Sequence, residues 1–304
     1  MMEKSVNYKK LRFALKLAVS VFLIIFIFYK FPISDILAVL KNTDYFWLAV
    51  SFLLAEFIIL NQAVRWRYLL IVPDERKPEF SALLKYTAIG YFFNMLAPGG
   101  IGGDAYRSVA LGRLHNFMAS SVAAVFVAKI LGFLALCLLF WFALPHTEGI
   151  SEQVVWFMAA ASLFLVVFCI CVAFNPFKKG RFGVFAEKLK SYKKYPFRLI
   201  MATFDSVFMQ ILGVLTYMAL FKATGISISL GLVFVVMPVT VLITAIPISL
   251  NGIGVREWSL LSLTAYTVNS EQILASLLLS YVIVILQAVQ GGIFYITSHD
   301  RVRV

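Results

Sequence analysis

Charged residues are scarce in this sequence. They make up 14% of its 304 residues, whereas soluble domains carry roughly 25%. Hydrophobic residues make up 62%, and they fall in long runs that leave no segment of useful size for a soluble domain. The shortage of charge excludes a water-soluble globular protein and predicts a protein embedded in a membrane.

Cysteine and histidine are also rare, with three of each. Zinc sites need clustered cysteine and histidine ligands, whereas these histidines stand singly at segment ends. The sequence also lacks a nucleotide-binding loop and a nucleophile paired with a base. We therefore predict no disulfide, no metal site, no cofactor, no catalytic residue and no direct use of ATP. The cysteines lie inside apolar runs, where a small polarizable side chain packs well; they are Cys137, Cys169 and Cys171.

Basic residues outnumber acidic ones, and the net charge is +12. They fall between the apolar runs rather than on one soluble face, so anionic lipid headgroups are the expected partners and nucleic acid is not. The region 175–198 is the most basic stretch. It places four apolar residues at helical spacing opposite a lysine-rich face, which predicts an amphipathic helix lying on anionic cytoplasmic lipid. These four residues are Phe182, Phe185, Leu189 and Tyr192.

Six apolar runs are long enough to cross a bilayer, which takes about 20 residues. The first follows Lys16 and ends near Phe31. It lacks an Ala-x-Ala cleavage site, so we predict an uncleaved helix rather than a signal peptide. The sequence thus predicts an all-α polytopic membrane protein with residues 1–304 as a single integral membrane domain. The other five runs cover approximately residues 45–64, 117–144, 154–174, 199–221 and 273–297.

Two further apolar segments, 80–114 and 230–267, are interrupted by glycine-rich breaks: FNMLAPGGIGGDAYRS at 93–108 and AIPISLNGIGVREWS at 245–259. Irregular backbone is tolerated in hydrocarbon only where protein or a water-filled cavity surrounds it. If both segments return to the side they entered from, 22 of the 27 Lys and Arg residues lie on the cytoplasmic side with both termini. A single crossing would put region 175–198 outside, against the positive-inside rule. We therefore predict two re-entrant hairpins that enter from opposite sides.

The hairpins divide the chain into two related units. Residues 45–144 and 199–298 each contain a span, a hairpin and a second span, in opposite orientations, and region 175–198 links them. Inverted repeats built around broken helices are typical of transporters that bind cargo near the bilayer midplane. Chance similarity of two short glycine motifs is the alternative.

The first break has the features of an anion site. Pro98 ends one half-helix, and Asp104 can cap the next. Free amides at such a helix start attract anions, and Arg107, one turn on, offers a planar fork suited to phosphate. The alternative is that the glycines only permit a tight turn while Arg107 reaches toward the cytoplasmic interface. The glycines concerned are Gly99, Gly100, Gly102 and Gly103.

The second break repeats this pattern from the outer side, with Pro247 ahead of the turn. Arg256 and Glu257 open the next half-helix; as neighbours they point different ways, so we expect one to meet cargo and the other the opposite hairpin. The residues of the turn are Asn251, Gly252 and Gly254.

Two charged residues, Glu56 and Lys129, are predicted near the middle of the bilayer. A charge there costs roughly 2.5 to 3.5 kcal/mol on insertion scales, and it is usually paired or faces a cavity. We predict that the two approach each other or share a cavity, either as a gate or as a fixed ion pair between helices.

Other polar residues have simpler interpretations. Arg65, Trp66 and Arg67 have the composition of a cytoplasmic interface, because a ring and two cations suit the headgroup layer. Four more are interpreted as interhelical hydrogen-bonding groups: Asp205, Gln210, Gln287 and Gln290.

Several of these motifs together resemble the membrane region of lysylphosphatidylglycerol synthases and the broad family of flippase-like proteins related to it. The motifs are NMLAPGGIGGDAYR, the Arg65-Trp66 pair, KILG at 129–132 and IPISLNGIGVREW. Many relatives have arginine where Lys129 stands. In the bifunctional synthases a soluble aminoacyl-transferase domain follows this region; here the sequence ends at Val304, so we expect the translocation role without the transfer activity. The resemblance implies a lysylated phospholipid or a polyprenyl-linked glycan as cargo.

These observations favour a lipid translocase of the plasma membrane, the inner membrane of the cell. It would hold the headgroup in a polar cavity lined by both hairpins, with phosphate at Arg107 and Arg256. Two alternatives stay open: a membrane enzyme that transfers a group onto a lipid, with Asp104, Glu56 or Glu257 as base, and a small-solute secondary transporter. The expected partners are the lipid cargo and anionic cytoplasmic lipid, and a homodimer is left open.

Overall fold

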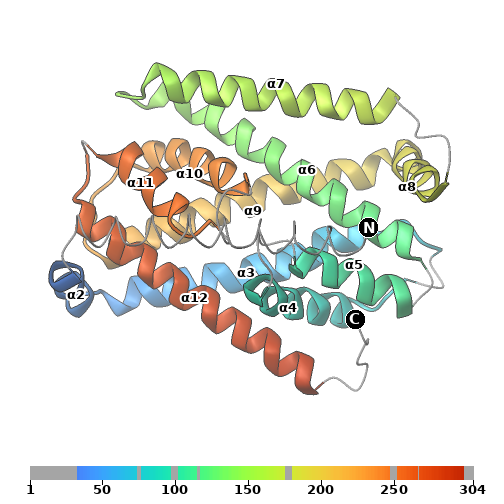
Figure 1. Ribbon diagram of the computed structural model, residues 1–304, viewed down its shortest axis with the longest axis horizontal. Coiled ribbons are helices and arrows are strands. Elements are labelled where there is room, and N and C mark those ends of the chain that lie inside the picture. The colour runs from blue at the N-terminus through green and yellow to red at the C-terminus, as the bar shows by residue number, and fades with distance from the viewer. Residues whose placement is uncertain are drawn as a thin grey trace, which may run out of the picture.

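The computed structural model describes residues 33–73, 77–96, 102–114, 117–174, 180–246, 252–265 and 267–297, and these residues form helices joined by turns (Figure 1). Five of the helices are long and apolar enough to cross a membrane, and the shortest of them has 23 residues, or about 35 Å at the helical rise. They coincide with five of the six predicted spans as candidate membrane-spanning helices; the first, ending near Phe31, lies outside the described residues. The five are α3 (Tyr45–Leu69), α6 (Met118–Ala143), α7 (Glu152–Phe174), α9 (Pro196–Ala223) and α12 (Ser270–Thr297).

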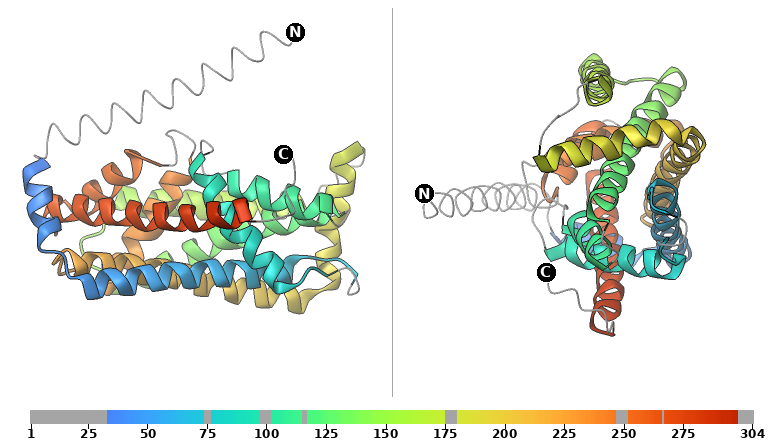
Figure 2. Two further views of the ribbon diagram at one scale, coloured as in Figure 1. Left: turned by 90° about the horizontal axis from the view of Figure 1, so that it is seen from below. Right: turned by 90° about the vertical axis from the view of Figure 1, so that its right-hand side faces the viewer.

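Shorter helices flank the two breaks. The first break lies between α4 (Phe80–Leu96) and α5 (Gly102–Leu114), and the second between α10 (Leu230–Ala245) and α11 (Val255–Thr264). The α4–α5 pair lies toward the end of the molecule where α8 (Gly180–Ser191) is found, and the α10–α11 pair toward the end of α2 (Ile33–Lys41) (Figure 1). Figure 2 shows α2 and α8 lying across opposite ends of the long helices. The centres of the breaks, residues 97–101 and 247–251, are outside the described residues.

Helices α3 and α9 pack together through the middle of the molecule. The Ser51 hydroxyl donates to the carbonyl of Thr216 at 3.1 Å, and the Asn61 amide donates to the carbonyl of Asp205 at 3.3 Å. Because the residue numbers rise along α3 as they fall along α9, the two helices are antiparallel. Their polar contacts saturate groups that would otherwise lie unpaired in hydrocarbon.

Each helix pair beside a break packs on the last long helix of the other half of the chain. The α4–α5 pair contacts α12 through stacked and edge-on aromatic rings, with Phe92 and Phe93 lying 6.2 Å and 5.3 Å from the Tyr295 ring. In the same way α10 packs on α6, where Val235 and Val239 share a buried cluster with Phe140. The contacts between the two halves of the chain therefore follow a reciprocal pattern.

Glycine allows α4 and α5 to approach closely. A Cβ atom at Gly103 would lie 2.2 Å from the carbonyl oxygen of Gly90, a separation that two nonbonded heavy atoms cannot adopt. The Gly103 amide donates to Asn94 Oδ1 at 2.7 Å. We predicted a free amide at Gly103 for an anion; this prediction was wrong, because Asn94 occupies the donor.

The exterior of the bundle is apolar. Helix α7 packs on α6 through Met158 and Leu165, while much of its remaining surface is exposed, including Trp156 and Phe164. A helix that is apolar all round and only partly buried by protein is suited to face lipid chains.

The predicted amphipathic helix in region 175–198 is present as α8, followed by the short 3-10 helix η4 (Tyr192–Lys194). Its apolar face packs on the protein core rather than on lipid: Phe185 and Leu189 contact a buried cluster that includes Tyr192. Burial raises the pKa of the Tyr192 hydroxyl, which donates to the carbonyl of Leu69. The prediction that this apolar face lies on lipid was wrong for these three residues, and the Phe182 side chain lies outside the described residues.

Candidate functional site

Asp104 in the first turn of α5 holds two cations. The Arg107 guanidinium donates to its Oδ1 oxygen, and the Lys129 ammonium, from α6, donates to its Oδ2 oxygen at 2.6 Å. A carboxylate in this position also suits the positive end of the helix dipole. We predicted that Asp104 would cap the amides of α5; instead its two oxygens bind side-chain cations.

Lys129 does not pair with Glu56, so that part of our prediction was wrong. Helix α5 packs along α6, with Tyr106 and Ala110 in one buried cluster with Ala128, and this contact brings Asp104 to Lys129. The Glu56 Oε1 oxygen is buried without a hydrogen-bond partner. A buried acceptor left in this state costs about 1 to 3 kcal/mol, so one oxygen of Glu56 is held at a cost that the described contacts do not offset.

Arg107 is buried, with 5% of its surface exposed, and its guanidinium lies over the Trp66 ring, 5.4 Å from the ring centroid. This arrangement differs from the alternative in which Arg107 reaches out toward the interface. The ring and the Asp104 carboxylate fix the planar fork in place, so one edge of the guanidinium is oriented by protein before any ligand arrives.

Arg65 is a buried cation that the sequence analysis placed at the membrane interface. Arg65 is 6% exposed and Trp66 is 1% exposed, so both side chains pack against protein rather than against lipid headgroups. One guanidinium nitrogen donates to the Ser206 hydroxyl at 3.1 Å, and the Nε nitrogen is buried without a partner. Arg65 forms no ion pair with a carboxylate among the described residues. A buried guanidinium in this state is a strong candidate to receive an anion.

The buried cations and carboxylates on this side of the molecule share one neighbourhood. Arg65 interacts electrostatically with Arg107, Asp104 and Asp205. The Tyr91 hydroxyl of α4 lies within electrostatic range of four charged residues: Arg65, Arg107, Asp104 and Glu56. The charges therefore form a connected group around α3, α4, α5, α6 and α9. We call this group the α5 charge cluster, consisting of Arg65, Asp104, Arg107 and Lys129.

Polar contacts between α6 and α9 lie beside the α5 charge cluster. The Gln210 amide donates to the carbonyl of Gly132 at 3.2 Å. A Cβ atom at Gly132 would lie 3.7 Å from the guanidinium of Arg65, so α6 passes directly beside this cation. Gln210 is the interhelical hydrogen-bonding group that its position in an apolar span predicts. Asp205 accepts from Asn61 through its backbone, and its Oδ2 oxygen is buried without a partner.

The carboxylate of the second break, Glu257, binds hydrogen-bond donors rather than cations. Glu257 is buried; its Oε2 accepts from the Gly254 amide at 2.7 Å and its Oε1 accepts from the Tyr281 hydroxyl of α12. Gly254 has a φ of +84° and precedes the first residue of α11, a conformation that glycine adopts without strain. Glu257 therefore closes the start of α11 and anchors it to α12.

Arg256 also meets α12, with its guanidinium 5.6 Å from the centroid of the Tyr281 ring. Arg256 and Glu257 form no ion pair with each other, as their neighbouring positions predict. The expectation that one of them contacts the opposite hairpin is not met among the described residues, since both meet Tyr281. Three predicted site residues lie outside the described residues: Gly99, Gly100 and Asn251.

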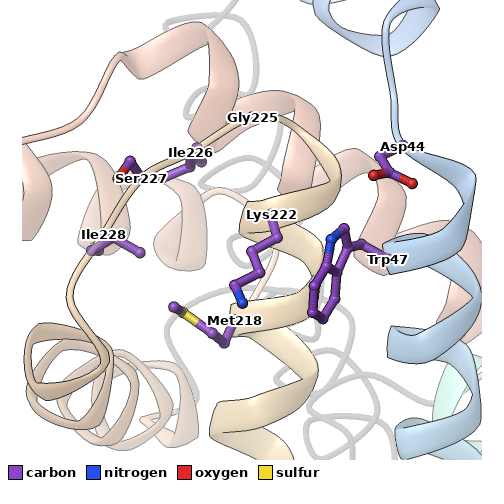
Figure 3. A pocket seen from close by; sticks show the side chains of 8 residues that line it. All are labelled: Asp44, Trp47, Met218, Lys222, Gly225, Ile226, Ser227 and Ile228. Carbon is purple, nitrogen blue, oxygen red and sulfur yellow. The ribbon is translucent and has the colours of Figure 1, made fainter.

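A cleft of about 370 Å³ opens where α3 begins and α9 ends (Figure 3). Its charged residues are engaged in local contacts: the Lys222 ammonium lies 4.2 Å from the centroid of the Trp47 ring, and Asp44 accepts from the Phe46 amide at 2.9 Å as the N-cap of α3. The cleft has no buried charge that lacks a partner, in contrast to the α5 charge cluster.

The long apolar helices and their polar interior define a multi-pass α-helical membrane protein. The chain belongs to the family of the lysylphosphatidylglycerol synthase transmembrane region, whose model matches residues 13–290. This match includes both breaks and the α5 charge cluster, and it confirms the resemblance found in the sequence motifs.

The chain is also similar to a protein described as a UPF0104 membrane protein from Methanothermobacter thermautotrophicus (strain Delta H). The two are 37% identical over 97 residues, which is 32% of this chain and 26% of the relative. The match thus spans about a quarter of the length of that relative.

Proposed function

We propose that this protein is a lipid translocase that moves a phospholipid or a polyprenyl-linked lipid between leaflets and holds the lipid phosphate at the α5 charge cluster. The observation that carries the proposal is the pairing in this cluster: Arg107 and Lys129 share the carboxylate of Asp104, and Arg65 is buried and forms no ion pair with any residue that the structure describes. Two cations that share one carboxylate, with a third cation nearby that has an unpartnered donor nitrogen, suit an incoming anion.

The arrangement supports an exchange of ion pairs. An entering phosphate binds the guanidinium of Arg65 first, then competes with Asp104 for Arg107 and Lys129. Arg107 and Lys129 pass from one anion to another and Arg65 gains one, so no cation is left without a partner anion during the exchange. The acyl chains stay in the surrounding lipid, against the apolar exterior.

Two re-entrant hairpins in an inverted repeat are part of the same proposal. Helices α4, α5, α10 and α11 have 10 to 17 residues, fewer than the about 20 that a crossing takes. The pairs lie toward opposite ends of the bundle (Figure 1), and each packs on the last helix of the other half. This reciprocal pattern is what a two-fold axis in the membrane plane produces.

We place both termini and α8 on the cytoplasmic side of the plasma membrane. The lysines after α8, Lys193 and Lys194, are exposed, and exposed lysines beside spans favour the cytoplasmic leaflet and its anionic lipid. The anionic lipid would then meet the lysine face of this segment while the apolar face packs on protein.

The carboxylates of Asp104 and Glu257 already have partners at both oxygens, which favours transport over catalysis. A general base needs an oxygen that can take a proton from the substrate. Both oxygens of Asp104 hold cations, and both oxygens of Glu257 hold donors. Glu56 is left as the one candidate base among the three considered, and it has no nucleophile or orienting partner in the described contacts.

Reconstitution into liposomes tests the proposal. We expect the wild-type protein to speed the exposure of a fluorescent phosphatidylglycerol to an impermeant quencher. Arg65→Ala should slow this movement, while the matched control Arg67→Ala, which removes an exposed arginine two residues away on the same helix, should retain it. Equal rates in the two variants would contradict the role of Arg65, and a wild-type rate equal to that of empty liposomes would contradict the translocase.

Lipid analysis of a deletion strain separates transport from synthesis. A translocase changes the distribution of a lipid between leaflets and leaves its total amount unchanged. Loss of a lipid species from the deletion strain would instead indicate a membrane enzyme.

A further inference from the structure

Asp205 presents a carboxylate that has no hydrogen-bond donor at its buried oxygen. It lies on α9, its Oδ2 oxygen is buried without a partner, and the Asn61 amide binds its backbone carbonyl rather than this oxygen. Within an apolar bundle, such an oxygen is stable only with a cation beside it or a proton on it.

One cation lies beside Asp205. Of the described residues, the helices packed against α9 bring one charged group to this carboxylate, the Arg65 guanidinium, and one amide, that of Asn61. Two hydrogen bonds place Arg65 close to Asp205: Arg65 donates to Ser206, the next residue on α9, and Asn61, one turn before Arg65 on α3, donates to the Asp205 carbonyl. Among the described residues, Arg65 and Asp205 form no salt bridge. Arg65 in turn is nine-tenths buried and has an unpartnered Nε nitrogen. The same guanidinium thus lies near Asp205 and has a donor nitrogen without a partner.

We propose that Asp205 is a proton-binding site coupled to the binding of the lipid phosphate at Arg65. When a phosphodiester binds the guanidinium, the positive charge of Arg65 no longer compensates Asp205 alone. Asp205 then takes a proton from water, forming an O–H bond at Oδ2. The site gains one negative charge from the phosphodiester and one positive charge from the proton. On release of the phosphodiester, the proton returns to water and Arg65 again balances Asp205.

This coupling rests on the proposed function, and it adds a proton that binds together with the lipid phosphate. Binding linkage is reciprocal, so a proton that follows the anion must also strengthen the binding of the anion. Anion affinity should therefore rise as the pH falls, by up to about tenfold per pH unit where one proton is taken up. In a membrane with a proton gradient, the side on which Asp205 exchanges its proton would set the direction of lipid movement.

Calorimetry on the detergent-solubilised full-length protein tests the coupling. The probe is dihexanoyl phosphatidylglycerol, a short-chain lipid with one phosphodiester charge, titrated in two buffers that differ in ionisation enthalpy. We expect the wild type to take up about one proton per phosphodiester. Asp205→Asn, a neutral mimic of the protonated acid, should bind the probe with no proton uptake and with an affinity independent of pH.

Two control variants assign the proton to one residue. Glu56→Gln removes the other carboxylate with a buried unpartnered oxygen, and Glu152→Gln removes an exposed carboxylate at the start of α7; both should take up the proton as the wild type does. Unchanged uptake in Asp205→Asn, or loss of uptake in Glu56→Gln alone, would overturn the assignment.

The same titration separates failure of this inference from failure of the proposed function. Binding of the probe by the wild type without proton uptake contradicts the coupling and leaves the translocase in place. Absence of binding contradicts both. A second arm uses glycerophosphoglycerol, the same phosphodiester without acyl chains: weaker binding than the lipid supports a lipid ligand, and equal binding contradicts it in favour of a small solute.

Discussion

The two breaks have similar sequences and different local structures. Each has Gly-Ile-Gly followed by an arginine and an acid, yet Asp104 binds two cations and Glu257 binds a backbone amide and a tyrosine hydroxyl. A carboxylate between cations can exchange them for another anion, whereas a carboxylate that closes a helix start is part of the scaffold. Similar motifs therefore point to different tasks: ion-pair exchange at the first break and structural support at the second.

The largest expected effect is a difference between the arginines of the two breaks. Arg107→Ala removes a buried, charge-assisted hydrogen bond and should slow the movement of phosphatidylglycerol in liposomes by about 10- to 100-fold. Arg256→Ala removes a contact with the Tyr281 ring and should slow it by no more than about fivefold. Arg107→Lys keeps the charge and serves as a control for folding. Equal losses in the two alanine variants would contradict the division of tasks.

The next effect compares the two carboxylates. Asp104→Asn frees Arg107 and Lys129 from their shared partner, so the short-chain lipid should bind more tightly while its movement slows by about tenfold, because no anion replaces it on release. Glu257→Gln should leave the rate nearly unchanged and lower the temperature of unfolding in detergent, since the Gly254 amide and the Tyr281 hydroxyl lose a charged acceptor, worth about 1 to 3 kcal/mol.

Thermal unfolding and lipid binding of both variants check this pair. A weaker lipid affinity in Asp104→Asn would show that Asp104 helps to hold the cargo rather than competing with it. A large loss of transport in Glu257→Gln without loss of stability would place Glu257 in the transport path.

The smallest expected effect concerns Lys129. Lys129→Arg keeps a cation beside Asp104 and should change the rate of lipid movement by no more than about twofold, whereas Lys129→Gln removes the ion pair and should slow it further. The side chain is 47% exposed, so there is room for the larger guanidinium. If Lys129→Arg slowed lipid movement as much as Lys129→Gln does, the shape of the side chain rather than its charge would determine the rate at this position.

The sequence predicted the long helices because their apolar runs exceed the thickness of a bilayer. The predicted spans 117–144 and 199–221 match α6 and α9 to within a few residues. The predicted span 45–64 ended five residues too early, since α3 continues to Leu69. This boundary had a consequence: Arg65 was assigned to the interface, and its burial against Ser206 of α9 went unseen.

The pairing of buried charges could not be predicted from the sequence for a physical reason. Counting residues along a span gives the depth of a side chain in the bilayer but not the neighbour that it faces. Glu56 and Lys129 were predicted at similar depth, yet α5 packs on α6 and Lys129 forms its ion pair with Asp104 instead. The apolar face of α8 was misassigned in a similar way, because amphipathic spacing is the same for a helix on lipid and a helix on protein.

The binding position of the lipid phosphate is the central feature of the proposed translocation. The measurement that tests it is an experimental structure of the full-length protein in a phosphatidylglycerol bilayer nanodisc. We predict phosphate density with oxygens about 3 Å from guanidinium nitrogens of Arg65 and Arg107, and with Asp104 no longer between Arg107 and Lys129. Phosphate density confined to the cleft beside Lys222, or an α5 charge cluster whose ion pairs remain closed in the presence of the lipid, would contradict the account.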